Sequence, residues 1–245
     1  MNDKKKFDLM NIGVALAIGL IVSSMLLGWA YTSGKKEDDA LKVTGSAKKR
    51  IKSDLVSWSA DVSYRAPKLA TAYDLLSENV PRVKKYLIEK GIKEEQITVS
   101  SISSTTLHGK DLNGNSTQEI IGYSLGQSVH VRSKDVDLVA KIARESTELI
   151  KQGILLDSNS PQYFYTKLGD LKIEMLGEAA KDARLRAEEI ANATGSSIGT
   201  IRSARMGVMQ ITAADSTEVS DYGISDTSSI HKDLTAVVNA NFAVY

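Results

Sequence analysis

The most constraining feature of this sequence is an uncharged run of twenty-five residues from Leu9 to Ser33. Lys4, Lys5 and Lys6 stand just before it. About twenty apolar residues, rising roughly 1.5 Å each along a helix, cross a hydrocarbon core of about 30 Å. We therefore predict a transmembrane anchor over residues 9–31, so that everything after it is held at a membrane.

A cleaved secretory signal is the competing interpretation of this run. The apolar core of such a signal covers about 7–15 residues and ends at a small-x-small cleavage site. Here the apolar run is much longer, and Gly28-Trp29-Ala30-Tyr31 is a poor site for cleavage. The pattern favours an uncleaved anchor, with cleavage as the alternative.

The charges that flank the run indicate its orientation. The three lysines before it exceed the two that follow, Lys35 and Lys36, and acidic residues count little in the positive-inside rule. A basic tail of residues 1–8 is also more easily retained in the cytoplasm than the long remainder of the chain. We predict a single-pass protein of the cytoplasmic (inner) membrane, with residues 34–245 in the periplasm or outside the cell.

A stripe of small residues lies within the predicted anchor. Ala15, Gly19 and Ser23 recur every four residues and would share one face of a helix. Such faces promote the association of helices in lipid, although small residues are common in transmembrane helices in any case. A homo-oligomer with these residues at a transmembrane contact is one prediction of the sequence.

Composition indicates a folded domain after the anchor rather than a charged tail. Hydrophobic residues make up 42% of the chain and charged residues 25%, as in an ordinary globular protein. Beyond residue 31, basic and acidic residues are equal in number, which argues against a nucleic-acid partner because phosphate binding relies on a basic excess. The chain has no cysteine and so no disulfide or thiol nucleophile.

The hydrophobic pattern after a polar linker of residues 32–40 predicts one α+β domain over residues 41–245, with helices packed on antiparallel or mixed sheets. Its order is ββαββαβαββ, and a break near residues 150–166 would divide it into two subdomains. After an opening strand, strands are expected at 55–64, 96–107, 123–132, 154–165, 198–212 and 234–245, and helices at 67–90, 136–150 and 171–194. Pro81 should kink the first helix.

Each expected helix has an apolar stripe at three- and four-residue spacing that should face the core. The third stripe consists mostly of alanine, which should let its backbone approach a neighbouring element closely. The stripes comprise Leu69, Ala72, Leu76, Val80, Val83 and Leu87; Val136, Ala140, Ala143, Thr147 and Ile150; and Leu171, Met175, Ala179, Ala183, Ala187, Ile190 and Thr194.

The sequence contains no recognisable catalytic, cofactor-binding or metal-binding pattern. His108, His130 and His231 are too far apart along the chain to be paired by helix or strand spacing. No nucleophile elbow, phosphate-binding glycine loop or zinc-protease motif occurs where the chemistry would need it. We predict no catalytic residue, no cofactor and no metal site.

One loop has part of a calcium-binding pattern. Asp111, Asn113 and Asn115 supply oxygens at the first, third and fifth positions. The sixth residue is Ser116 where glycine is needed, and the twelfth is Gly122 where a bidentate glutamate should stand. We favour a plain hairpin turn over a calcium site.

Several segments together resemble the SIMPL-domain family. They are Leu41–Ala47 leading into Ser53–Trp58, Gly91-Ile92 leading into Ile97–Ser100, the strand Gly122–Leu125, and the charged alanine-rich helix Glu178–Ala191 followed by Gly195 and Gly199. The resemblance rests on the order and spacing of these segments over roughly residues 40–245. Ser53-Asp54 departs from the Pro-Asp that the family often has there.

The resemblance implies an α+β envelope protein that builds large ring-like homo-oligomers and has a loose link to stress defence. It implies no established enzyme activity, so no catalytic residue is transferred. The favoured hypothesis is a membrane-tethered, self-assembling structural or interaction protein of the cell envelope. The alternative is a ligand-binding module or hydrolase whose site forms between subunits.

Overall fold

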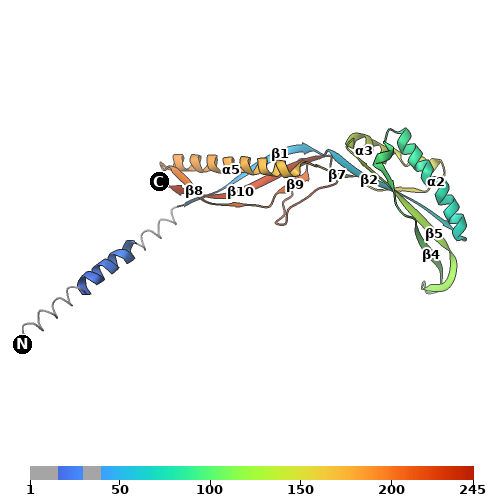
Figure 1. Ribbon diagram of the computed structural model, residues 1–245, viewed down its shortest axis with the longest axis horizontal. Helices are drawn as coiled ribbons and strands as arrows, with labels where there is room; N and C mark the ends of the chain where they lie inside the picture. The colour runs from blue at the N-terminus through green and yellow to red at the C-terminus, as the bar shows by residue number, and fades with distance from the viewer. Residues whose placement is uncertain (1–15, 30–39) are drawn as a thin grey trace, which may run out of the picture. The chain divides into compact units, whose positions relative to one another are not determined.

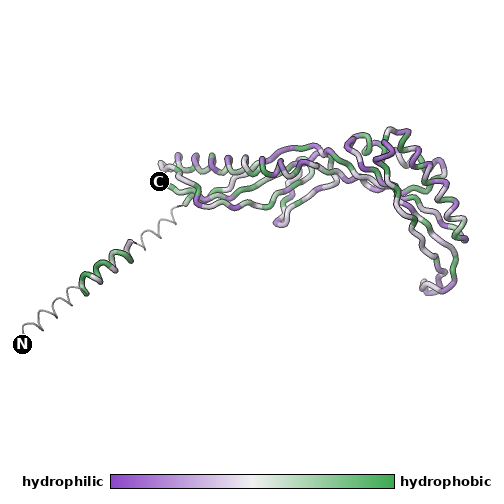
Figure 2. Tube along the Cα trace, in the orientation of Figure 1, coloured by the Kyte–Doolittle hydropathy of each residue, from purple (hydrophilic) through white to green (hydrophobic). Residues whose placement is uncertain are grey.

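The computed structural model describes residues 16–29 and 40–245 (Figure 1). Residues 16–29 form a helix whose side chains are exposed, and Figure 2 shows the segment as largely hydrophobic. Within the described residues, no helix has both the length and the apolar character needed to cross a membrane. The predicted span 9–31 begins and ends outside the described residues, and Ala15 also lies outside them.

Residues 40–245 form an α+β fold of two compact units, which we describe separately. Unit 1 comprises the described part of Met1–Ser46 together with Leu176–Gly207 and Val237–Tyr245. Unit 2 comprises Ala47–Met175 and Val208–Ala236. The predicted break near residues 150–166 lies inside unit 2.

Unit 2 is built around two long antiparallel strands, β2 (Leu55–Ala66) and β5 (Ser116–Ser133). Their register runs from Val56 opposite Ser133 to Ala66 opposite Tyr123. Four short strands complete this sheet: β3 (Ile97–Val99) and β4 (Ser103–Lys110) pair with β5, and β6 (Leu156–Ser158) and β7 (Gln162–Phe164) pair with β2.

Helices pack on one face of the unit 2 sheet. They are α2 (Leu69–Glu89), α3 (Val136–Glu145) and the single turn α4 (Glu148–Lys151), and a 3-10 turn, η1 (Glu94–Gln96), precedes β3. The alternation predicted for residues 55–64 is confirmed, because the inward set of β2 is buried. That set is Val56, Trp58, Ala60, Val62 and Tyr64.

Several predicted elements are each two shorter elements in the structure. Residues 96–107 form β3 and β4 because the ladder to β5 shifts register by one residue between Val99 and Ser103, where Ser100 Oγ accepts a hydrogen bond from the backbone N–H of Ser128. Residues 154–165 form β6 and β7 on either side of Pro161, which has no N–H to donate to a ladder. Residues 136–150 form α3 and α4, so that Leu149 is buried and Ile150, predicted inside, is exposed.

The sheet of unit 1 has the order β1-β10-β8. Its strands belong to β1 (Ala40–Lys52), β10 (His231–Val244) and β8 (Ile198–Met206), while β9 (Gln210–Ala213) pairs with the unit 2 part of β10. Predicted strand 198–212 is therefore interrupted after Met206. The helix α5 (Leu168–Ala193) lies along the unit 1 sheet (Figure 1).

The core of unit 1 is small and rich in alanine. One cluster of its buried residues comprises Val43, Ala183, Ala187, Ala240 and Phe242. The predicted stripe of α5 is confirmed from Leu171 to Ala187, but Ile190 is 45% exposed and Ala191 is buried in its place. The step of four from Ala187 to Ala191 keeps the buried face in line with the 3.6-residue turn.

Candidate functional site

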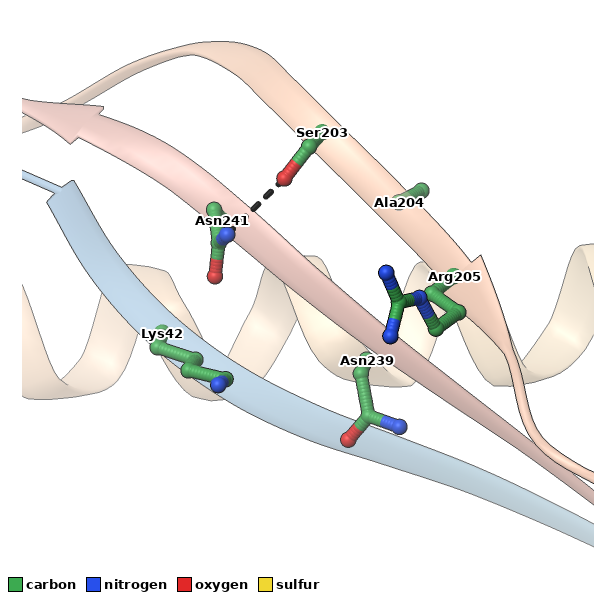
Figure 3. A pocket seen from close by; sticks show the side chains of 6 residues that line it. All are labelled: Lys42, Ser203, Ala204, Arg205, Asn239 and Asn241. Atoms are coloured by element: carbon green, nitrogen blue, oxygen red, sulfur yellow. Dashed lines mark hydrogen bonds between the residues drawn. The ribbon is translucent and has the colours of Figure 1, made fainter. Parts of the chain in front are cut away.

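The unit 1 sheet carries a polar pocket on the face opposite α5 (Figure 3). It has a volume of about 400 Å³. Each of the three strands contributes to its lining. The lining residues are Lys42 from β1, Ser203, Ala204 and Arg205 from β8, and Asn239 and Asn241 from β10. We call this site the polar pocket.

The alternation of β10 places the two asparagines in the pocket. Val238, Ala240 and Phe242 are buried, so Asn239 and Asn241 point to the other face. Across the ladder, Asn239 is opposite Arg205 and Asn241 is opposite Ser203. The sequence predicted this alternation but gave no signal that joined the asparagines to β1 and β8.

Two hydrogen bonds orient the polar groups of the pocket. Thr44 Oγ1 donates to Asn239 Oδ1 at 2.7 Å, which leaves the amide nitrogen of Asn239 for another acceptor. Asn241 Nδ2 donates to Ser203 Oγ at 2.8 Å, which leaves the hydroxyl hydrogen of Ser203 available. The pocket therefore presents hydrogen-bond donors toward solvent.

Two positive charges flank these donors. Figure 3 shows Arg205 extending from β8 toward β10 and Lys42 lying along β1 on the other side of β10. In the part of the chain that the structure describes, neither cation has a carboxylate within ion-pair distance, whereas Lys48, Lys49, Arg50 and Lys52 of the same β1 strand all do. The lining contains no carboxylate and no aromatic ring.

A second polar cluster, in unit 2, surrounds the buried carboxylate of Asp233. Its side chain is 1% exposed and accepts hydrogen bonds from Arg50 Nε at 2.9 Å and from the backbone N–H of Asp215 at 2.9 Å. Lys48 Nζ lies 3.0 Å away. The hydrogen bond from Arg50 holds the pKa of Asp233 well below its usual range. Both carboxylate oxygens of Asp233 are engaged by these groups, so we assign this cluster a structural role.

A third cluster pairs Lys232 with Asp226. Lys232 is 2% exposed, and its Nζ lies 3.2 Å from Asp226 Oδ2 while also donating to the backbone carbonyl of Asp226. Burial lowers the pKa of Lys232. Burial alone would raise the pKa of Asp226, but hydrogen bonds from Ser228 and Lys232 hold it below its usual range. Nothing in the sequence indicates this pair, because both residues lie between the predicted strands 198–212 and 234–245, where no element is expected.

The residues weighed for metal binding lie apart or are already engaged. His108 is in β4, His130 in β5 and His231 at the start of β10. Within residues 16–29 and 40–245, no three His, Cys, Asp or Glu side chains are grouped to hold a metal ion.

The Asp111 loop is the predicted hairpin turn. It joins β4 to β5, with Lys110 opposite Ser116, and Gly114 takes a φ of 84°, which glycine adopts without strain. Asp111 Oδ1 accepts hydrogen bonds from the backbone N–H of Asn113 and Asn115. The bond from Asn115 is the main cause of the lowered pKa of Asp111.

One set of residues on the polar face of unit 2 has the composition of a hydrolase triad. Ser59 stands opposite His130, and Asp61 lies two residues along β2. Asn159 Nδ2 donates to both Ser59 Oγ and Asp61 Oδ2, and Ser128 donates to Asp61. Among the described residues, no hydrogen bond joins His130 to Ser59 or Asp61, so the geometry lacks the relay that activates a serine.

A family model matches residues 41–242, under the description SIMPL, protein of unknown function. The chain belongs to the SIMPL family. The match confirms the family that the sequence resembles, and it spans both units described above. No curated protein matches the sequence significantly.

Proposed function

We propose that this SIMPL protein is a membrane-tethered, self-assembling protein of the cell envelope with a structural or interaction role. It would be a single-pass protein of the cytoplasmic membrane with its N-terminus inside and its bulk in the periplasm or outside the cell. A part in envelope or oxidative stress defence belongs to this proposal, and it rests on the family resemblance alone.

The tether is supported by the uncharged run from Leu9 to Ser33 and the three lysines before it. Residues 16–29, which lie inside this run, are helical and expose large apolar side chains throughout. Leu16, Leu20 and Leu27 are each more than 60% exposed. An apolar helix of this kind is stable in lipid rather than in water.

Self-assembly is supported by the edges of the unit 1 sheet, which is the observation that carries this proposal. Both β1 and β8 pair only with β10 among the described residues, so the outer edge of each presents unpaired backbone groups. Unprotected edges of this kind are templates for pairing with another chain. The occupant we propose is a second copy, with β8 of one subunit beside β1 of the next.

The exposed apolar side chains of β8 support the proposal that a second subunit covers this edge. Ile201 is opposite Phe242 and Met206 is opposite Val238, so both lie on the face that carries α5. They remain 53% and 58% exposed. Because β8 and β1 are different edges, such a contact is head-to-tail, and it closes into a ring when its rotation permits.

Membrane fractionation tests the tether. The full chain should remain in the membrane pellet after an alkaline wash, and protease added outside the cytoplasmic membrane should remove residues 34–245 but not the N-terminal tail. Recovery of the protein in the soluble fraction would contradict the tether, a shortened chain there favouring cleavage and an intact chain favouring a free protein.

The anchor stripe adds a separate proposal, in which Ala15, Gly19 and Ser23 form a contact between anchors. Gly19 and Ser23 are exposed in the structure, and no other described atom would crowd a Cβ on Gly19. Crosslinking of wild type against Gly19→Leu tests it, with Gly28→Leu as the matched control. An unchanged oligomer yield in the Gly19 variant would contradict the stripe.

The alternative function, a ligand-binding module, is favoured by the polar pocket. The hydrolase form of that alternative has no support from the hydrogen bonds around Ser59 and His130. A small molecule retained by the purified protein in native mass spectrometry would favour the binding module.

A further inference from the structure

The two positive charges of the polar pocket have no acidic partner within the described part of the molecule. Lys42 and Arg205 face the same cavity of about 400 Å³ without a carboxylate partner. Elsewhere in β1, every basic residue from Lys48 to Lys52 has an acidic partner, as in Lys49 with Glu174 at 2.6 Å. Within the described part of the molecule, the two pocket cations are therefore open to the charge of a ligand.

The neutral groups between the cations are set to donate. The oxygen of the Asn239 amide is occupied by Thr44, so its nitrogen is free to donate. The oxygen of Ser203 accepts from Asn241, so its hydroxyl hydrogen is free to donate. Among the described residues, Asn241 Oδ1 is the side-chain oxygen of the lining that accepts no hydrogen bond.

Two cations and two neutral hydrogen-bond donors around one cavity suit an oxyanion as the ligand. A tetrahedral anion accepts several hydrogen bonds at once, and charge-assisted bonds from lysine and arginine are about twice as strong as neutral ones. A neutral sugar would present hydroxyl donors as well as acceptors, and the pocket has no aromatic ring on which a sugar face could stack. A metal cation is disfavoured because the lining has two positive charges and no carboxylate.

We infer that the polar pocket binds a phosphate group. Lys42 and Arg205 contact it from opposite strands, and Asn239 Nδ2 and the Ser203 hydroxyl donate to its remaining oxygens. Asn241 orients Ser203 through the 2.8 Å hydrogen bond and is a positioning residue. No chemical step is involved, since no nucleophile or general base lines the pocket.

The phosphate has two possible sources that share this chemistry, free phosphate and a phospholipid headgroup. The second rests on the proposed tether. Lys42 follows Tyr31, the last residue of the predicted anchor, by eleven residues, and an extended chain of that length reaches at most about 40 Å. A headgroup in the same membrane is thus within reach of the pocket.

Isothermal titration calorimetry of the full chain in a neutral maltoside detergent tests the site. Inorganic phosphate should bind the wild type, and the Lys42→Ala/Arg205→Ala variant should bind at least about tenfold more weakly, as expected for two lost charge-assisted bonds. The matched control is Lys110→Ala/Arg132→Ala. It removes the same charge from exposed positions on β4 and β5.

Further measurements distinguish loss of binding from loss of folding, and free phosphate from a phospholipid headgroup. Lys42→Arg/Arg205→Lys keeps both charges and should retain most of the binding, and unchanged thermal unfolding of each variant shows that the fold is intact. Tighter binding of dihexanoyl-phosphatidylglycerol than of phosphate identifies the headgroup as the source, and binding of phosphate alone identifies free phosphate. Absence of phosphate binding to the wild type, or an equal loss in the control variant, would overturn the inference, whatever the fractionation result for the tether.

Discussion

Gly45 of β1 lies so close to the backbone of Ala183 in α5 that there is no room for a side chain at position 45. A Cβ placed on Gly45 would overlap the backbone of Ala179 and Ala183 and would lie 2.7 Å from Ala183 Cα. The alanine face of α5 was predicted to allow a close approach, and this contact confirms it. The whole core of unit 1 depends on this approach because it contains few large side chains.

Gly45→Ala should therefore destabilise the protein by about 3 kcal/mol or more, at the upper end of overpacking costs, because the obstructing atoms belong to the backbone. The matched control is Gly177→Ala on the exposed side of α5, where nothing lies within 4 Å of an added Cβ. That change should stabilise the helix by about 1 kcal/mol. Urea unfolding of both variants measures the difference, and equal stability of the two would refute the close approach.

Asp233→Asn should lower stability at pH 7 by about 2 kcal/mol, the net contribution of hydrogen bonds to a charged, buried carboxylate. The folded-state pKa of Asp233 lies below that of an unfolded aspartate, about 3.9, owing mainly to Arg50. Its stabilisation is therefore complete above about pH 4 and declines as the pH falls further.

Thermal unfolding of wild type and Asp233→Asn between about pH 7 and pH 2 tests this pH dependence. The gap between their midpoints should be constant down to about pH 4 and should narrow below it. Asp170→Asn, in the first turn of α5, controls for loss of a carboxylate outside this cluster. A gap of constant size at every pH would show that ionisation of Asp233 does not stabilise the fold.

Lys232→Met should destabilise the protein by about 3 kcal/mol because it leaves Asp226 without its buried cation. Adding Asp226→Asn should recover part of that loss, since no uncompensated charge then remains. A double-mutant cycle measured by urea unfolding gives the coupling. Additive effects of the two changes would mean that the pair contributes no interaction of its own.

Ile201→Lys and Met206→Lys should weaken self-assembly, because each places a charge on the exposed apolar face of β8 that we propose a second copy covers. Ile173→Lys on α5 is the control, since Ile173 is 74% exposed and lies outside this edge. Crosslinking yield should fall in the β8 variants and hold in the control. A uniform fall in all three would point to general destabilisation instead.

Much of the fold could be read from hydrophobic periodicity. The buried face of β2 follows its apolar spacing, and β10 alternates from Leu234 to Phe242 as expected. The stripe of α2 is confirmed from Ala72 to Leu87, but Leu69, in its first turn, is 47% exposed. The structure differs from this pattern where local backbone features divide a predicted element. Ser100 and Pro161 divide apolar stretches that read as single strands, and Ile150 falls on the exposed side of α4.

The residues that line the polar pocket could not be predicted from the sequence to lie together. Lys42, Ser203 and Asn239 are polar residues on three separate strands, and their proximity depends on the β1-β10-β8 order, which periodicity does not encode. The pairing of Arg205 with Asn239 likewise depends on ladder register. Buried ions such as Lys232 were missed for a related reason, because a lysine in a polar stretch gives no sign that it will be enclosed.

The most direct test of the account is the mass of the full chain after mild detergent extraction, measured by light scattering with the detergent contribution subtracted. Self-assembly predicts a protein mass that is a multiple of 26.6 kDa and that falls in the Ile201→Lys variant. A wild-type mass of 26.6 kDa at every concentration would contradict it.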